Sequence, residues 1–210
     1  MEVLIVPDHH AESEFEDRKS VFLGHLMPVE SEEEAKDFVE KMKKRYGDAR
    51  HNVWAYRLTD GNFRSSDDGE PSGTGGEPVL DAMVKRGISG CVIVVTRYFG
   101  GILLGTGGLV HAYSSAASEA LNRAGKAGIY PYVSYTLALD YTQYGRLSRL
   151  LEKAGCKEIR PEFAEEVTVK FRVPEEEEEA LCREIREAFC GARIPERKGR
   201  VYIKSSLPAG

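Results

Sequence analysis

Three carboxylates stand close together in the stretch SSDDGEPSGTGG, at Asp67, Asp68 and Glu70. Carboxylates at this spacing can coordinate magnesium or serve as a general acid and base. The same residue types are typical of a turn, because Asp-Gly bends the chain and Pro71 fixes a backbone angle. Both interpretations stay open. The sequence offers no convincing nucleophile, so it identifies no catalytic residue, and it predicts no metal site.

A second stretch, RYFGGILLGTGGLVHAY, is rich in glycine and follows the apolar run CVIVV. Glycine inside regular structure costs about 0.5–1 kcal/mol relative to alanine, so this composition needs a physical reason. Gly105 and Gly107 precede, and Gly108 opens, a helix predicted over 108–125, where N–H groups and the helix dipole can hold a phosphate. No Lys-Ser or Lys-Thr pair follows, which excludes a P-loop. The alternative is a tight strand-to-helix turn without a ligand.

Arg97 and Tyr98 end a predicted buried strand, just before Gly100 and Gly101. An arginine beside exposed aromatics can pair with phosphate and stack on an unpaired base. The alternative is that Arg97 forms a salt bridge with one of the three carboxylates and that the aromatics belong to the core. Inward-facing carboxylates need such a cationic partner. The sequence does not decide between the two.

The formal net charge of the 210 residues is −5, which argues against a general nucleic-acid binder. The exception is the segment 85–130, which has a single acid and five bases, Lys85, Arg86, Arg97, Arg123 and Lys126. No run approaches the roughly 20 apolar residues of a membrane span, and we expect no signal peptide. Four scattered cysteines without a CxxC pair indicate a reducing compartment. We therefore expect a cytoplasmic protein.

Hydrophobic spacing predicts alternating strands and helices in the first part of the chain. The predicted strands are 19–29, 51–59 and 91–99, and the predicted helices are 32–46, 79–86 and 108–125. Ser31 and Glu34 have the spacing of a capping box. His51 begins a strand, and a lone histidine is more often structural than catalytic. The stretch 60–78 has turn chemistry almost throughout, and a loop of that length is usually functional or mobile.

The pattern after residue 131 is regular. The order is strand, helix, strand, strand, helix, strand, which is the ferredoxin-like βαββαβ arrangement. The predicted elements are, in that order, 132–140, 142–155, 156–160, 165–173, 174–191 and 199–204. The stretch 127–131 is interpreted as a linker. We therefore predict an α+β protein with two domains, residues 1–130 and residues 131–210.

Three stretches together resemble the motifs of the YigZ/IMPACT family; they are DARHNVWAYR (48–57), SSDDGEPSGTGG (65–76) and TRYFGGILLGTGGLVHAYS (96–114). Their order is also that of the family, and the match covers the whole first domain. Bacterial members have a ferredoxin-like second domain like the one predicted here. One departure is Gly75, which stands where the family usually has alanine.

This resemblance implies a fold for each domain and a function connected with translation. The first domain would be an Impact-type N-terminal domain with the fold of elongation factor G domain IV, a ribosomal-protein-type α/β sandwich. The second would resemble domain V of the same factor. Eukaryotic relatives restrain the amino-acid-starvation kinase by competing for its ribosome-associated activator, and the fold of bacterial members suggests RNA or ribosome binding.

We therefore expect a non-enzymatic translation-associated or regulatory protein, which binds RNA, the ribosome or a ribosome-associated protein through its glycine-rich face. The predicted binding residues are Arg97, Tyr98, Gly100, Gly101, Gly107, Gly108, Asp67, Asp68, Glu70, His51, Arg57, Lys85 and Arg86. We expect no cofactor and no membrane association, and the oligomeric state stays open. The alternative is a magnesium-dependent phosphotransferase or hydrolase that uses the three carboxylates and an anion site at Gly105–Gly108.

Overall fold

A computed structural model describes residues 3–207, and the chain forms two compact units, the second of which is Ile129–Ser205. The first unit contains β1 (Leu4–Pro7), β2 (Ala11–Asp17), β3 (Ser20–Pro28), α1 (Glu32–Arg45), β4 (His51–Arg57), β5 (Phe63–Ser66), α2 (Gly76–Lys85), β6 (Cys91–Tyr98) and α3 (Gly105–Ala124). The rest of the chain contains β7 (Lys126–Leu139), α4 (Tyr141–Lys153), β8 (Lys157–Phe163), β9 (Val167–Pro174), the 3-10 helix η1 (Glu175–Glu177), α5 (Glu178–Ala188) and β10 (Glu196–Ser206).

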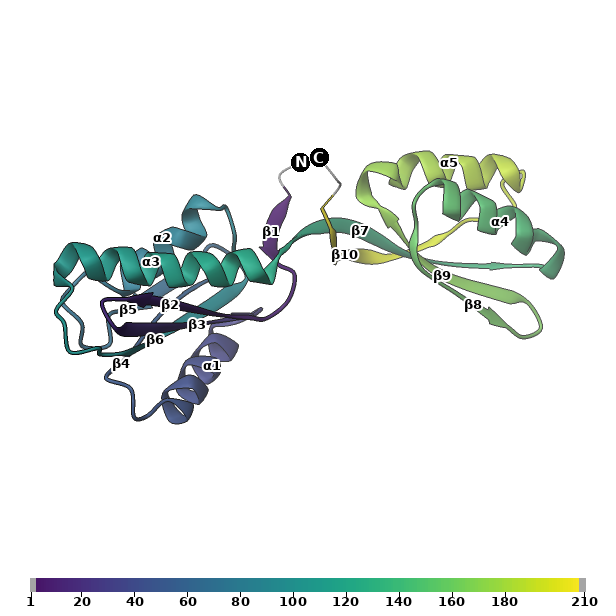
Figure 1. Cartoon of the computed structure of the whole chain (residues 1–210). Helices are drawn as coiled ribbons and strands as arrows, with labels where there is room; N and C mark the ends of the chain where they lie inside the picture. The colour runs from purple at the N-terminus through teal and green to yellow at the C-terminus, as the bar shows by residue number, and fades with distance from the viewer. Residues whose placement is uncertain (1–2, 208–210) are drawn as a thin grey trace. The chain divides into compact units, whose positions relative to one another are not determined.

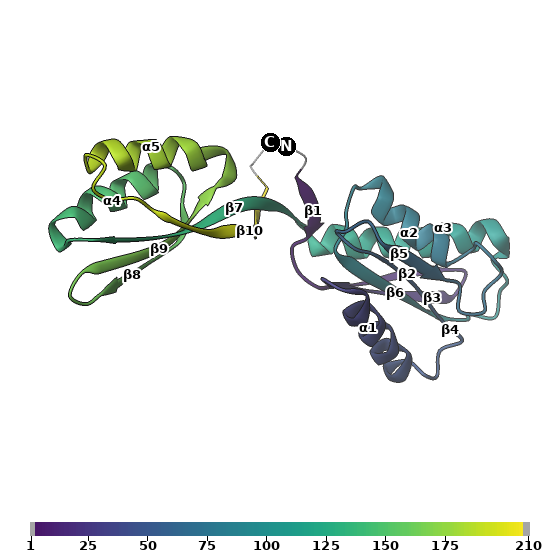
Figure 2. The ribbon, with the colours of Figure 1, turned by 180° about the vertical axis from the view of Figure 1, so that it is seen from behind.

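The first unit has three layers, with the antiparallel sheet β2-β3-β6-β4-β5 in the middle. Helices α2 and α3 cover one face of this sheet and α1 covers the other (Figure 1 and Figure 2). Alternate residues of β6 therefore enter different cores. Ile93 and Val95 pack with residues of α2 and α3, whereas Val92 and Val94 pack with residues of α1. Burial on both faces, which the sequence predicts, explains why this strand begins CVIVV without polar alternation.

The loop predicted over 60–78 is shorter in the structure. Strand β5 pairs with β4, and α2 already begins at Gly76, which leaves residues 67–75 as the connecting loop. The sequence does not predict β5, because this short strand lies at the edge of the sheet with exposed or half-buried side chains. No apolar alternation marks such a strand.

Two further predictions are wrong. The stretch 127–131 is not a linker, because it lies inside the continuous strand β7. Helix α3 begins at Gly105, three residues before its predicted start, so Gly105 and Gly107 lie in its first turn and do not precede it. The prediction at the start of α1 is largely confirmed, since Ser31 caps that helix by accepting from the N–H of Glu34 at 3.2 Å.

The second unit has the predicted element order β7-α4-β8-β9-α5-β10. Its strands are hydrogen-bonded in the order β10-β7-β9-β8, and α4 and α5 lie on one face of this sheet (Figure 1 and Figure 2). Buried Leu147 and Leu151 of α4 and Leu181 and Ile185 of α5 fill the core between the helices and the strands. In the described part of the chain, no helix has the length and apolar character needed to cross a membrane.

Candidate functional site

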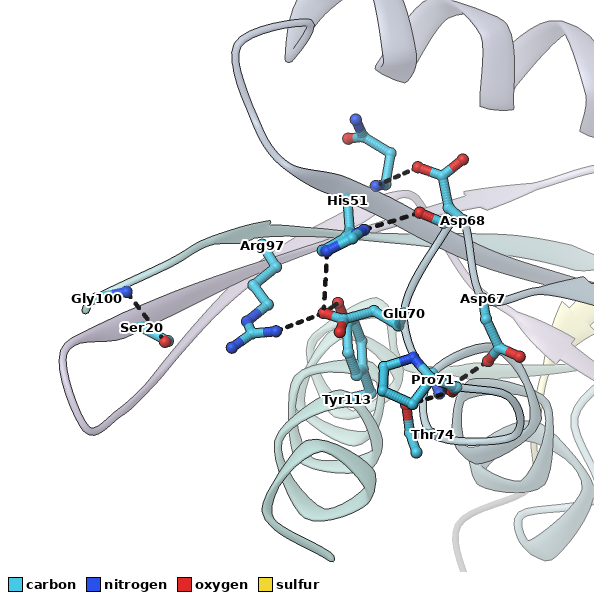
Figure 3. A network of polar contacts seen from close by, with 12 residues as sticks. Ser20, His51, Asp67, Asp68, Glu70, Pro71, Thr74, Arg97, Gly100 and Tyr113 are labelled. Atoms are coloured by element: carbon cyan, nitrogen blue, oxygen red, sulfur yellow. Dashed lines mark hydrogen bonds and ion pairs between the residues drawn. The ribbon is translucent and has the colours of Figure 1, made fainter. Parts of the chain in front are cut away.

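A cluster of polar side chains is assembled from separate segments of the first unit (Figure 3). The strand register places His51 of β4 beside Arg97 of β6. Tyr113 reaches the cluster from α3, and Glu70 reaches it from the loop 67–75. The structure therefore brings together several residues that the sequence singles out from distant stretches.

Glu70 is the common acceptor in this cluster. Its Oε1 accepts a hydrogen bond from Arg97 Nη1 at 2.6 Å and another from the Tyr113 hydroxyl at 2.8 Å. The Glu70 and Arg97 side chains are 3% and 7% exposed, so they form a buried ion pair. Burial and the neighbouring Glu70 carboxylate raise the pKa of the Tyr113 hydroxyl, which therefore stays protonated as a donor.

The Arg97 side chain is buried and contacts groups of the protein interior. Its guanidinium lies over the rings of Phe22 and Phe99, 5.6 Å from each ring centroid. Its Nε is buried and has no hydrogen-bond partner among the described residues. Of the two alternatives that the sequence leaves open for this arginine, the structure has the salt bridge to a carboxylate of the 67–75 loop.

His51 and Asp68 connect the buried pair to the loop backbone and to α1. A carbonyl oxygen can only accept, so His51 Nδ1 donates to the Asp68 carbonyl at 2.8 Å. His51 Nε2 then faces Glu70 Oε1 at 3.9 Å. The Asp68 carboxylate accepts from the Asn52 N–H at 2.7 Å and pairs with Lys43 at 2.9 Å. These contacts fix the loop against the start of β4.

Asp67 organises the remainder of the loop. Its carboxylate accepts hydrogen bonds from the backbone N–H groups of Gly73, Gly75 and Gly76 at 2.9, 3.0 and 2.8 Å. Burial favours the neutral acid, but these three donors outweigh burial and hold the pKa of Asp67 below its usual value. The ionised carboxylate at the start of α2 thus satisfies N–H groups that the helix itself leaves without partners.

The three carboxylates are therefore all bound by groups of the fold. Among residues 3–207, no group of three or more histidine, cysteine, aspartate or glutamate side chains is placed to hold a metal ion. The enzyme alternative is not favoured by this geometry, because each carboxylate already accepts from donors of the protein. What the cluster does chemically is to fix the 67–75 loop beside the end of β6.

Different structural constraints account for individual glycines in the glycine-rich segment that follows β6. A Cβ atom on Gly100 would lie 2.0 Å from the carbonyl carbon of Lys19, so only glycine fits against this hairpin backbone. Gly101 and Gly105 have φ of +85° and +72°, in the left-handed region that favours glycine. Gly107 is different, because a Cβ atom there would meet no described atom within 4 Å outside its own helix turn. Packing does not explain Gly107.

Three large apolar side chains between β6 and α3 are exposed. Phe99, Ile102 and Leu103 are 42%, 44% and 81% exposed, and these three side chains are called the apolar loop below. Arg18, which is exposed at the turn between β2 and β3, donates to the Leu103 carbonyl at 3.3 Å. The exposed Lys19 follows it. The glycine-rich segment therefore presents large apolar side chains next to two cations from a different part of the chain.

Three predicted binding residues lie away from this segment. Arg57 pairs in register with Cys91, at the opposite end of β6 from Arg97. Arg86 donates to Ser118 of α3 at 3.0 Å, about 20 Å along that helix from its first turn. Lys85 precedes Arg86 at the end of α2. Contrary to the expectation that Lys85 and Arg86 supply charge to the glycine-rich turn, the structure does not bring them to it, and Arg57 also lies away from it.

Several contacts of the site escape sequence reasoning. Tyr113 falls on the apolar face of its helix, which predicts its burial and hides the role of its hydroxyl. Lys43 and Arg18 reach the site only through the packing of α1 and through a hairpin that the sequence does not predict. Tyr98, predicted to stack on a base, is half-buried and donates its hydroxyl to Asp48 at 3.0 Å.

The sequence matches two family models. The Impact N-terminal domain matches residues 18–121, and a domain of unknown function, DUF1949, matches residues 137–192. The first match contains both the polar cluster and the glycine-rich segment. The second match lies within the βαββαβ unit.

Individual relatives agree with these matches. The chain is 38% identical over 193 residues to the IMPACT family member YvyE of Bacillus subtilis, which covers 90% of this chain and 88% of that protein. A shorter similarity, 36% over 107 residues, links 48% of this chain to 33% of Protein IMPACT of Oryctolagus cuniculus. A solved crystal structure of a hypothetical protein is 32% identical, with a TM-score of 0.62 and coverage of 93% of this chain and 97% of that one. The chain belongs to the IMPACT family.

Proposed function

We propose that this protein is a non-enzymatic, translation-associated binding protein of the cytoplasm. Its partner is a ribosome-associated protein or the ribosome itself, and its contact surface is the glycine-rich face of the first unit. Membership of the IMPACT family supports the link to translation, because the resemblance to eukaryotic members implies competition for a ribosome-associated activator. The geometry of the first unit supports the choice of surface.

The observation that carries the proposal is the exposure of the apolar loop. Phe99, Ile102 and Leu103 stand in solvent within one short connection, although apolar side chains of this size are usually buried. Exposed apolar clusters on soluble proteins often mark interaction sites. The close packing of Gly100 on the β2–β3 hairpin and the buried ion pair behind it hold the loop in place. A preorganised apolar surface of this kind suits a protein partner.

RNA contact is the second mode that the same face supports. Arg97 does not supply the charge for it, because its guanidinium is bound by Glu70. Arg18 and Lys19 are exposed beside the apolar loop and can meet phosphate. The two modes differ in their salt dependence, since phosphate contacts release counterions and apolar contacts do not.

We also propose that the two units have the folds implied by the family resemblance. The second unit supports a ferredoxin-like fold, because it has the element order βαββαβ and the sheet order β10-β7-β9-β8. The first unit supports an arrangement like elongation factor G domain IV only through its mixed α/β sandwich. On this assignment the second unit would resemble domain V of that factor.

The test is co-sedimentation of the full chain with ribosomes, and with ribosome-free RNA, at low and moderate salt. Leu103→Ser is expected to reduce ribosome binding several-fold, whereas Val84→Ser, at a 51% exposed position of α2, leaves it unchanged. If a protein surface is bound, binding persists at moderate salt. If phosphate is bound, binding falls steeply with salt and falls further in the variant with Arg18→Ala and Lys19→Ala.

Two outcomes contradict the proposal. One is the absence of ribosome binding at low salt. The other is equal binding by wild type, by Leu103→Ser and by the double variant at positions 18 and 19, which would leave the glycine-rich face without a role.

A further inference from the structure

A small pocket of about 140 Å³ in the second unit is lined by three arginines, Arg186, Arg193 and Arg197. Arg186 projects from α5, Arg193 from the connection between α5 and β10, and Arg197 from β10. Tyr135 of β7 and Cys182 of α5 complete the polar lining. Nothing in the function proposed above uses this pocket.

The three guanidinium groups are not equally free. Arg193 donates from Nε to Gln143, from Nη1 to the Ala138 carbonyl and from Nη2 to Asp140, so its role is structural. Arg197 donates from Nε to Glu178 at 2.8 Å and also interacts with Tyr135, and its two terminal nitrogens contact no carboxylate of the described residues.

Arg186 is the third arginine that lines the pocket. The side chain of Arg186 is exposed and makes no hydrogen bond or ion pair within residues 3–207, although its backbone carbonyl accepts from the Gly191 N–H. Donors are therefore available from Arg186 and from the outer edge of Arg197, on two different elements that border the same pocket.

The charge balance at this pocket is positive. Its lining contains no described carboxylate, and the only carboxylates that these arginines contact among the described residues are Asp140 and Glu178. Burial favours the neutral acid of Glu178, but hydrogen bonds from Tyr135 and Arg197 outweigh burial and lower its pKa, so this carboxylate stays ionised and holds Arg197. With three cations against two carboxylates, the charge of Arg186 is uncompensated.

A second pocket, in the first unit, differs from the arginine-lined pocket in its charge balance. It has about 200 Å³ and is lined by Lys36, Lys43 and Arg64. Each of these cations already pairs with an acid, and Glu40 also lines the pocket. Its charges are balanced, so it lacks the excess of free donors found in the second unit.

We propose that the arginine pocket binds a phosphate group between Arg186 and the terminal nitrogens of Arg197. A guanidinium presents paired N–H donors that match the oxygens of phosphate. A volume of about 140 Å³ is below the range of roughly 300–1,000 Å³ typical of drug-sized ligands, so the pocket accommodates one small group. Exposed Ile194 and neighbouring Pro195 border it and can contact the remainder of an ester. The phosphate belongs to a small phosphorylated molecule or to an RNA backbone.

Two thiols make the proposal testable in the intact chain. Cys182 lines the pocket and is half-buried, whereas Cys190 is exposed and does not line it. Both are free thiols. The full chain is labelled with iodoacetamide at constant ionic strength and rising inorganic phosphate, and each labelled peptide is quantified by mass spectrometry. Labelling of Cys182 is expected to slow saturably, while labelling of Cys190 stays constant.

Variants assign the binding to the arginines. Arg186→Ala is expected to raise the phosphate concentration for half-protection at least ten-fold. Arg183→Ala, on the exposed side of the same helix, serves as the matched control and leaves it unchanged. Arg197→Lys keeps the charge near Glu178 and tests the second ligand without removing the ion pair.

The ligand source follows from two further titrations. A nucleoside monophosphate and a short single-stranded RNA are compared with inorganic phosphate, and the tightest of the three identifies the source. Equal slowing at both thiols, equal protection by chloride, or unchanged protection in Arg186→Ala would overturn the proposal. None of these measurements involves ribosomes, so their failure is distinct from failure of the function proposed above.

Discussion

At the scale of single residues, one carboxylate determines how the site is built. Glu70 is buried with the full charge of Arg97 opposite it, and the Tyr113 hydroxyl satisfies the same oxygen. A buried ion pair gives little net stability compared with apolar residues, but a single buried charge without its partner is strongly unfavourable. We therefore interpret this pair as a device that fixes the 67–75 loop to the end of β6.

The first prediction concerns Glu70. Glu70→Ala is expected to lower the free energy of unfolding by about 3–5 kcal/mol, because it leaves Arg97 buried without a counter-charge. Urea denaturation followed by the fluorescence of Trp54, the single tryptophan of the chain, measures this change. The combination of Glu70→Leu with Arg97→Met is expected to recover most of the loss, because no charge then remains buried.

A matched control for Glu70 comes from an exposed ion pair. Glu119 and Arg123 lie one turn apart on α3, with side chains 43% and 55% exposed. Glu119→Ala is expected to leave the midpoint of denaturation nearly unchanged, because solvent screens such pairs. Equal, small effects of Glu70→Ala and Glu119→Ala would contradict the structural role assigned to Glu70.

At the scale of helices and strands, the sequence predicts elements with a strong apolar period and misses those without one. β6 and the inner face of α3 are recognised from CVIVV and from the spacing of leucine and alanine. β2 has the sequence AESEFED, in which small or polar Ala11 and Ser13 are the buried positions, so its alternation is weak. Lys126–Leu139 contains glycine and proline near its start, which resembles a linker, yet it forms one strand.

The candidate site is partly predictable for the same reason. The sequence places Arg97 and the carboxylates in separate stretches and leaves a salt bridge between them as one of two open alternatives. It cannot choose Glu70 as the partner, because that choice depends on how the 67–75 loop folds over β4. Nor does it place Arg18 beside Leu103, because the β2–β3 hairpin that carries Arg18 is not recognised. Contacts between elements, unlike periodicity within one, are set by tertiary packing.

The second prediction concerns the first turn of α3. Gly107→Ala is expected to raise the free energy of unfolding by about 0.5–1 kcal/mol, because alanine suits a helix better and its Cβ meets no neighbouring segment. Ribosome binding by the same variant is expected to weaken, since a glycine without a packing reason allows close approach of a partner. Thermal unfolding and co-sedimentation measure the two effects on one sample.

Gly100→Ala is the comparison for that variant. Its Cβ would lie 2.1 Å from the Lys19 carbonyl oxygen, so the hairpin or the loop must move and stability is expected to fall. If Gly107→Ala is stabilised and binds ribosomes like wild type, Gly107 does not belong to the contact surface.

At the scale of the whole molecule, the chain has separate hydrophobic cores. Two clusters of buried residues belong to the first unit, one on each face of its sheet, and a third belongs to the second unit. No residue is shared between the third cluster and the other two. Units with their own cores can unfold in separate steps, so a single free energy of unfolding need not describe this chain.

The third prediction follows from these separate cores. Leu151 is fully buried in the second unit, and Leu151→Ala is expected to destabilise that unit by about 2–5 kcal/mol. Trp54 packs in a core of the first unit, so its fluorescence reports that unit alone. We expect part of the far-ultraviolet circular dichroism of this variant to be lost at lower urea, while the fluorescence midpoint stays at its wild-type value.

Met83→Ala, in the first unit, should move the fluorescence midpoint. A common shift of both signals in Leu151→Ala would mean that the two units unfold as one, because independent cores cannot transmit that loss.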